Sequence, residues 1–576
     1  MKKIIYCLSF ILCVVSSTAQ DITDSAKKVK KQVISSEYDR NSLTIIGLKT
    51  DSPLAGKVAQ MIDTLKVGDK FYSNDIGFRN IPYNVVVSVF DKNQQDKVFK
   101  TDVPKLLNDN KVGQGIVAKW FNRQADGSFN TDMLKERGVY NSDDSDLSIA
   151  NSTKRGESAL MDAGLGLIDR SYVLVLGVSN LITMDQYYDQ IKAAPEARKM
   201  NGVKGDLVGQ LFKLNFNDSV SAVFFQDIWA DKGAADLNAK SVKFSATTFP
   251  LVSVKNIIMP MQATQYNAGQ SLAPKVQKTQ DELLRDLVNN SVTNILNHLT
   301  YQVSDFKVKA QVYKTNPIAV KIGKKEGLGF DQRYFVYENR QTKNGETYSS
   351  RRAVIKSMSV ADNRNVTSGE TQPSYFYQVA GGKIDNMGMF VEQRIDAGVN
   401  LALGYQANAM SGIDGRFEYY IGRLMYGKKN GAIAKGMTSF KLYISGGYNS
   451  IDDQYTLDAA TGTEKVDMLR VSAGLSKDYY LTSFLHVGPF AGYGIESSTG
   501  KTSKYKVETG FVEGGLRLGI NLKYNLQLIG SGTYYFMLSP TVKDNSGTAV
   551  SNPGKFDSYF PDRGGFGASV GIRFML

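Results

Sequence analysis

The feature that most constrains this chain is a two-residue alternation that runs to its final residue. In the closing segment GGFGASVGIRFML, apolar side chains recur at every second position, with small or polar residues, among them Arg573, between most of them. Successive side chains of a β-strand point to opposite faces, so the segment predicts a strand with one apolar and one mostly small or polar face. The apolar residues are Phe566, Ala568, Val570, Ile572, Phe574 and Leu576.

The same alternation recurs upstream, so that eight such segments can be laid out from about residue 395 onward. Alternation alone would also suit a soluble β-sandwich with one wet face. The connections separate the two folds, because short turns at one end and long polar loops at the other are typical of outer-membrane barrels. The short connections are 480–483 and 522–525, with 427–436 somewhat longer, and the long ones are 449–465, 496–504 and 539–563. We therefore predict an antiparallel transmembrane β-barrel of about eight strands over residues 390–576.

Charged residues of both signs share the small-residue face of these segments. An eight-stranded barrel is only about wide enough inside for its own side chains, and an enclosed charge must be paired. The pattern thus predicts a plugged interior with paired charges instead of a pore. The predicted interior charge cluster comprises Asp396, Arg416, Glu418, Lys441, Arg470, Glu513, Arg517 and Arg573.

These segments, together with the terminal Phe574-Met575-Leu576, resemble the small OmpA-type outer-membrane barrels. The resemblance implies an outer-membrane location, contact with outer-membrane lipid, and recognition by the barrel insertion machinery. It also implies a terminal assembly signal, here Phe566, Val570, Ile572, Phe574 and Leu576. In the family the last residue is usually aromatic or large and apolar; this chain ends on Leu576 with Phe574 two positions earlier, a modest departure.

Residues 1–20 have a basic start, an apolar stretch and a small-residue exit, which predicts a secretory signal peptide. Both cysteines, Cys7 and Cys13, lie in this segment, and neither follows the small residue that a lipoprotein anchor needs. After it, no apolar run is long enough for a helical membrane span. The mature chain is therefore expected to contain neither a disulfide nor a cysteine metal site.

Residues 21–301 have the mixed patterns of an α/β or α+β region. Within it we predict strands at 42–48 and 83–90 and a hairpin formed by 207–216 and 220–229. We also predict a helix at 280–299 with an apolar stripe. This stripe is expected to form part of the domain core or, as the alternative, a partner-binding face. An even strand count in the barrel would place this region on the same side as the C-terminus, in the periplasm.

Residues 302–389 predict a small all-β module of SH3 or OB size, from the glycine turn and strand rhythm of GKKEGLGFDQRYFVYE and the closing VAGGKIDNMGM. This rhythm is weakly similar to β modules of periplasmic flagellar and curli-type assembly proteins. The fold expected for the whole chain is thus multidomain, with an α/β or α+β region, this module and the C-terminal barrel.

The inventory of reactive residues argues against an enzyme. The only histidines are His298, near the end of the predicted helix, and His486, which faces the predicted barrel interior. Neither lies in a zinc or triad motif, and no glycine-rich stretch has phosphate-binding spacing, so no catalytic residue, cofactor or metal is expected.

The function predicted first is a non-enzymatic outer-membrane protein that anchors a large periplasmic region, which binds a protein or cell-wall partner in a structural or assembly role. The alternatives are a component of a transport or secretion complex and a barrel enzyme acting on lipid or peptide. The formal net charge of +13 suits anionic envelope surfaces better than nucleic acid, which is not expected as a partner in an exported protein. A generally solvated basic surface explains the same charge equally well.

Overall fold

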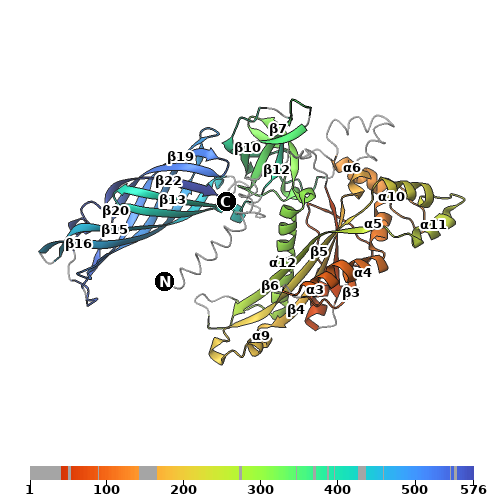
Figure 1. The fold of residues 1–576 in the computed structure, drawn as a ribbon, viewed down its shortest axis with the longest axis horizontal. Helices are drawn as coiled ribbons and strands as arrows, with labels where there is room; N and C mark the ends of the chain where they lie inside the picture. Colours follow the sequence, from red (N-terminus) through yellow and green to blue (C-terminus); the bar gives the residue numbers. More distant parts are fainter. Residues whose placement is uncertain are drawn as a thin grey trace. The chain divides into compact units, whose positions relative to one another are not determined.

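The computed structural model describes residues 40–49, 53–87, 90–141, 165–270, 276–345, 347–366, 372–385, 388–394, 396–425, 436–457, 460–544, 546–550 and 554–576. These residues fall into two compact units, one containing residues 40–308 and the other residues 309–363 and 372–576 (Figure 1). The predicted signal peptide lies outside the described residues. Among the described residues, no helix is both long enough and apolar enough to cross a membrane.

The first unit is built on a mixed sheet with the strand order β2-β1-β4-β5-β6 and β3 beside β1. Strand β1 pairs in parallel with β2, β3 and β4, whereas β5 runs antiparallel between β4 and β6. The strands are β1 (Ser42–Lys49), β2 (Tyr72–Ser73), β3 (Asn80–Pro82), β4 (Ser171–Thr183), β5 (Met200–Leu214) and β6 (Leu251–Tyr266). The α-helices are α2 (Pro53–Asp63), α3 (Lys92–Asp96), α4 (Val103–Asp109), α5 (Val112–Trp120), α6 (Asp132–Asn141), α9 (Met184–Gln190), α10 (Asp218–Val223), α11 (Leu237–Ala246) and α12 (Gln280–Gln302).

Both faces of this sheet are covered, which explains why β4 reads as a continuous apolar run. Tyr172 and Leu174 of β4 belong to the core that contains the buried stripe of α12, whereas Val173 and Val175 belong to the core that contains α5. The predicted helix at 280–299 is confirmed as α12, which begins with a capping box between Thr279 and Glu282. Its predicted stripe is buried: Leu283, Leu284, Leu287, Val288, Val292, Ile295 and Leu299.

Two predictions for this region were wrong. No hairpin forms over 207–229, because β5 ends at Leu214 and the side chain of Asn217 accepts a hydrogen bond from the Val220 amide as the N-cap of α10. The segment 83–87 is also not a strand, although Val85 and Val87 are buried in the core. Their alternation reflected burial of side chains and not pairing of the backbone.

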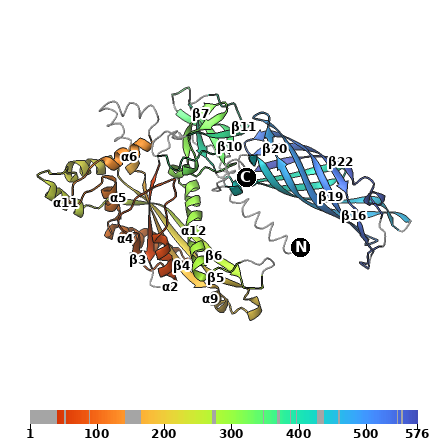
Figure 2. The same cartoon turned by 180° about the vertical axis from the view of Figure 1, so that it is seen from behind.

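In the second unit, residues 309–393 form a closed six-stranded barrel, hereafter the module, with the order β10-β11-β8-β7-β12-β9 (Figure 2). Its strands are β7 (Lys309–Thr315), β8 (Ile318–Val320), β9 (Arg333–Gln341), β10 (Thr347–Ser359), β11 (Ser374–Gly381) and β12 (Phe390–Gln393). The all-β character predicted for this segment is therefore present. The barrel starts later than the predicted boundary at residue 302, because α12 runs to Gln302.

The C-terminal strands close into the predicted eight-stranded antiparallel barrel, drawn in teal and blue in Figure 1. Closure is made by β13 and β22, with Leu403 opposite Ile572. The eight strands are β13 (Val399–Asn408), β14 (Gly412–Tyr420), β15 (Phe440–Leu457), β16 (Ala460–Lys477), β18 (Leu485–Gly500), β19 (Lys506–Lys523), β20 (Leu526–Met537) and β22 (Gly565–Met575), with the short β17 (Tyr479–Tyr480) and β21 (Thr541–Lys543) paired beside them.

The predicted loop at 449–465 is instead a continuation of the barrel ladder, in which β15 and β16 remain paired from Phe440 opposite Lys477 to Leu457 opposite Ala460. Polar residues gave the segment the composition of a loop, yet an antiparallel ladder needs only backbone pairing to continue. The connection between β13 and β14, residues 409–411 at this same end, is short.

Candidate functional site

The outer surface of the barrel is apolar. Large hydrophobic side chains at alternate positions of its strands are exposed, among them Leu403, Ile444, Leu475, Leu516, Leu518, Val570 and Ile572. Exposed aromatic residues lie toward both ends of this band, with Tyr479, Phe484 and Phe574 at one end and Tyr405, Tyr493, Tyr534 and Phe566 at the other. A closed barrel with an apolar exterior between aromatic girdles is the form in which strands cross a lipid bilayer.

Inside the barrel, Glu418 is the centre of a buried ion cluster. Its carboxylate lies 3.1 Å from the ammonium of Lys441 and 3.2 Å from the guanidinium of Arg573. Arg517 donates to the same carboxylate, and the amide of Asn400 donates to it at 3.0 Å. An enclosed carboxylate with this many partners is fully compensated in a low-dielectric interior.

A second carboxylate of this cluster, Asp478, was missed in the sequence. It lies directly after β16, is buried, and binds Lys441 at 2.5 Å and Arg573 at 2.9 Å. Arg573 also donates to Gln527 at 2.6 Å and to Nε2 of the buried His486 at 2.7 Å. The alternation does not include Asp478, because this residue follows the alternating segment. The signal that could have found it is its place just before the predicted turn at 480–483, where a residue lies at the barrel rim.

The other predicted interior residues lie farther along the barrel. Glu513 accepts hydrogen bonds from Tyr443 at 2.6 Å and Ser472 at 2.8 Å, while the Arg416 guanidinium lies 4.1 Å from the centre of the Tyr443 ring. Arg470 pairs with Asp414 at 3.1 Å.

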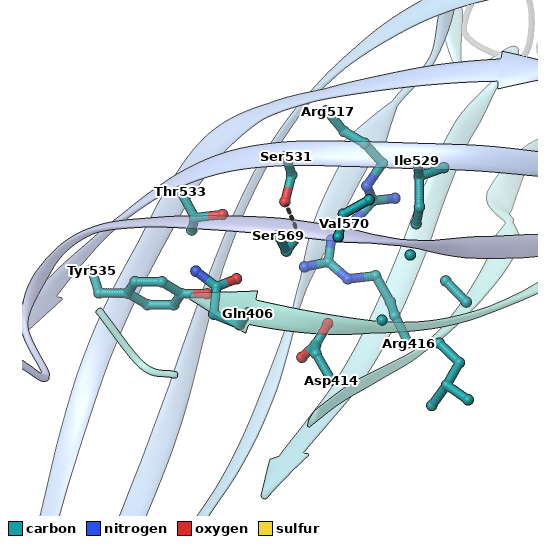
Figure 3. A pocket seen from close by; sticks show the side chains of 14 residues that line it. Gln406, Asp414, Arg416, Arg517, Ile529, Ser531, Thr533, Tyr535, Ser569 and Val570 are labelled. Carbon is teal, nitrogen blue, oxygen red and sulfur yellow. Dashed lines mark hydrogen bonds between the residues drawn. The ribbon is translucent and has the colours of Figure 1, made fainter. Parts of the chain in front are cut away.

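Figure 3 shows Arg416, Arg517 and Asp414 around a pocket of about 20 Å³. That pocket is large enough for about one water molecule.

At the end of the barrel that carries the long hairpin, the connection between β20 and β22 folds back onto the strands. Phe556 and Phe560 are buried against Val466, Met468 and Val507 in a small apolar cluster. Arg563, from the same connection, binds the buried Glu496 through two hydrogen bonds of 3.0 and 2.8 Å. This bidentate pair ties the connection to the interior wall of β18.

The module contacts the opposite end of the barrel through buried polar groups. Asp331 of the module accepts hydrogen bonds from Tyr377 at 2.8 Å and from the Ser439 amide, next to β15, at 3.0 Å. Asp396 was predicted inside the barrel, which is wrong: it precedes β13 and binds Arg423 at 2.5 Å and Lys356 of β10 at 3.6 Å. Its place in the alternation could not reveal that the ladder starts only at Val399.

Burial and charge act against each other in this junction. Burial would raise the pKa of Asp396, but the charges of Lys356 and Arg423 hold it at about 2. Burial lowers the pKa of Lys356 to about 8, with Asp396 opposing that shift. Burial also raises the pKa of Asp331. The junction thus contains a lysine whose charge is only weakly favoured at neutral pH.

Further contacts join the module to the rim of the barrel. Tyr524, in the turn between β19 and β20, donates to the Arg351 carbonyl at 2.9 Å, and Asn521, near the end of β19, donates to the Val379 carbonyl at 2.5 Å. On the closing strand, the Met575 carbonyl accepts from Arg333 at 3.1 Å. The module therefore binds several separate turns of the barrel and its last strand.

The predicted assembly-signal residues all belong to the closing strand or its end. Phe566, Val570, Ile572 and Phe574 are exposed on the apolar exterior, and the Leu576 amide donates to the Val399 carbonyl at 2.9 Å, just beyond β22. Their role in assembly stays a prediction.

The two histidines lie in different surroundings. His486 is enclosed by the barrel, and burial and the nearby Lys255 lower the pKa of His298 in α12. In the described ranges, no group of three His, Cys, Asp or Glu side chains is arranged to hold a metal ion.

No family model and no curated protein matches this chain. Among solved structures, it is similar to the N-terminal β-barrel domain of OprF from Pseudomonas aeruginosa, with 13% identity, 31% of this chain and 96% of that chain covered, and a TM-score of 0.19. A major outer membrane protein from Thermus thermophilus matches with 13% identity, 31% and 98% coverage, and a TM-score of 0.23. Ail, the attachment invasion locus protein of Yersinia pestis, matches with 10% identity, 31% and 97% coverage, and a TM-score of 0.18.

The similarity to these structures concerns the fold. The assignment of a membrane barrel of outer-membrane type rests on the molecule's own geometry, namely strand closure, the apolar exterior and the paired charges inside.

Proposed function

We propose that the protein is anchored in the outer membrane by its C-terminal barrel and holds the module and residues 40–308 in the periplasm, where the latter bind a protein or cell-wall partner. The observation that carries the proposal is the docking of the module on the barrel end where a short turn joins β19 and β20, opposite the end with the long hairpin of β15 and β16 and the long connection between β20 and β22. In outer-membrane barrels the short turns face the periplasm. The role is structural or assembly-related.

The interior favours an anchor over a conduit. Glu418 with its cationic partners and Glu513 with its bond from Tyr443 occupy the barrel interior, and the pocket beside Arg416 has a volume of about 20 Å³. The purified full chain in a planar bilayer is expected to give no discrete conductance. A steady single-channel current would favour the transport alternative instead.

The orientation can be tested with single cysteines, because both natural cysteines lie in residues 1–20. The two variants are Lys343→Cys and Lys501→Cys. Lys343 lies in the connection between β9 and β10 of the module, and Lys501 lies between β18 and β19, at the barrel end opposite the one that the module contacts. A membrane-impermeant maleimide should label Lys501→Cys on intact cells and Lys343→Cys only after the outer membrane is permeabilised. The reverse pattern would contradict the orientation.

Partner binding is tested separately with the full chain. A photo-crosslinker at Val242, an exposed apolar residue of α11, reports contacts of residues 40–308 in intact cells. Sedimentation with purified peptidoglycan sacculi distinguishes a cell-wall partner from a protein partner. If neither assay yields a specific complex, the barrel remains an anchor but the partner-binding role is wrong.

A further inference from the structure

A cationic cluster lies where the module meets the barrel rim, formed by Arg351, Arg352, Lys383 and Lys523, and is here called the rim cluster. Arg351, Lys383 and Lys523 are exposed, and Arg352 is half-buried. Lys523 ends β19, immediately before Tyr524, whose ring centre lies 3.9 Å from the Arg351 guanidinium. Arg352 donates to the Lys383 carbonyl at 3.2 Å, which ties the two module segments together.

Aromatic rings and a backbone bulge hold the two arginines in place. The Arg351 guanidinium lies over Tyr524 and also over Phe335, at 4.7 Å from the Phe335 ring centre. A register shift between Arg351 and Ala353 places a β-bulge at Arg352, and bulges re-aim side chains. Glu338 of the paired strand is bound to Arg340 at 2.7 Å, and within the described ranges no carboxylate forms an ion pair with Arg351 or Arg352.

Exposed apolar side chains adjoin this cluster on the barrel. Leu522 is 54% exposed and Phe484 is 56% exposed. The two are neighbours in the fold, because the Asn521 amide donates to the Phe484 carbonyl at 2.9 Å. Leu522 directly precedes Lys523, and both are exposed, so the apolar band of the barrel adjoins the cations.

We infer that the rim cluster binds the phosphate of an anionic phospholipid in the adjacent leaflet, while the acyl chains lie on Leu522 and Phe484. A stacked guanidinium presents its N–H groups in a fixed fork that matches phosphate oxygens, and the cluster continues the surface that already faces lipid. The lipid would bridge module and barrel and hold the junction at the membrane surface. This inference rests on the proposed insertion of the barrel in a membrane.

The test uses the full chain purified in non-ionic detergent and native mass spectrometry with added phosphatidylglycerol, phosphatidylcholine or inorganic phosphate. The wild type should retain phosphatidylglycerol under conditions that remove phosphatidylcholine. The double variant Arg351→Gln/Arg352→Gln should lose about a hundredfold in retention, since about two charge-assisted hydrogen bonds are removed. Arg351→Lys/Arg352→Lys, which keeps the charge but not the fork, should fall between them.

The matched control is Lys501→Gln/Lys555→Gln, which removes the same charge from exposed positions near the other barrel end and should leave retention unchanged. Leu522→Ser should weaken retention of the lipid without affecting inorganic phosphate, as expected for a lipid site. Equal retention by the arginine double variant, or complete displacement of the lipid by inorganic phosphate, would overturn the inference. Extraction of the wild type from membranes by alkaline carbonate would instead refute the anchor itself, so the two failures are distinguishable.

Discussion

Glu418 and Lys441, on the adjacent strands β14 and β15, face each other with 3.1 Å between carboxylate and ammonium, and neither side chain is exposed. Because Asp478 and Arg573 bind the same pair, each charge in the cluster depends on the others. Removing one member therefore leaves the remaining charges without compensation.

Glu418→Gln should destabilise the barrel by about 3 to 5 kcal/mol, since Lys441, Arg517 and Arg573 would then share a single buried carboxylate, Asp478. The measurement is the urea midpoint of unfolding in detergent micelles, followed by the gel mobility of folded and unfolded barrel. Glu508→Gln is the matched control, because Glu508 is partly exposed and binds Lys506 and Lys543 at the surface. It should cost about 1 kcal/mol or less, and an equal loss in both variants would contradict the buried cluster.

Lys356 should make the junction more stable as pH rises above 8. Its folded pKa is about 8, below the 10.5 of an ordinary lysine, so between these values the unfolded chain binds the proton and the folded one does not. Stability from this group is thus fully present above 10.5 and falls as pH drops toward 8.

The expected change is that proteolysis of the module becomes slower as the pH rises from 8 to 9.5. This range lies below the pKa of ordinary tyrosines, so their ionisation does not contribute. Lys356→Met should lack this pH dependence, whereas Lys343→Met, at an exposed loop position, should keep it. A parallel pH dependence in Lys356→Met would assign the effect to other groups.

Phe574→Ser should reduce the fraction of chain that reaches the folded barrel more than Leu403→Ser does. Both residues are exposed on the apolar exterior of neighbouring strands, so the loss of lipid contact is similar, about 2 kcal/mol. Only Phe574 belongs to the predicted assembly signal. The readout is the heat-modifiable fraction in a pulse-chase experiment, and identical yields from the two variants would remove the support for that signal.

Gly209→Ala should destabilise the sheet of residues 40–308 by about 1 to 3 kcal/mol through overpacking. A Cβ at Gly209 would lie 2.9 Å from Cδ1 of Ile295 in α12. Ile295→Val removes that methyl group and should recover part of the loss in the double variant.

Both tryptophans, Trp120 and Trp229, lie in this unit, so its unfolding can be followed by tryptophan fluorescence in the full chain. Gly56→Ala in α2, where a Cβ meets nothing within 4 Å, is the control and should be neutral or slightly stabilising. A failure of Ile295→Val to relieve Gly209→Ala would mean that the clash is not with the helix.

The eight strands could be predicted from sequence because lipid on one side and enclosed side chains on the other impose alternation on each strand separately. The same holds for the stripe of α12, whose residues repeat with the period of the helix. The signal is local in both cases, and neither prediction required knowledge of a distant contact.

What could not be predicted depends on residues far apart in the chain or on competing local signals. Asp331 and Ser439 meet across the junction although 108 positions separate them, and no periodicity marks either residue. The sequence Asn217-Asp218-Ser219 is compatible with a turn and with a helix N-terminus, and in the structure Asn217 is the N-cap of α10. In the same way, Asp478 lies one position beyond its strand, where alternation carries no information.

The contact between Arg333 and the Met575 carbonyl has a consequence for the order of biogenesis. The surface that receives the module includes the closing strand β22, which follows the other barrel strands in the chain, together with the turn at Tyr524, and these groups come together only when β22 pairs with both β13 and β20. An incomplete sheet lacks part of the docking surface, so the module can make all of these contacts only after the barrel has closed.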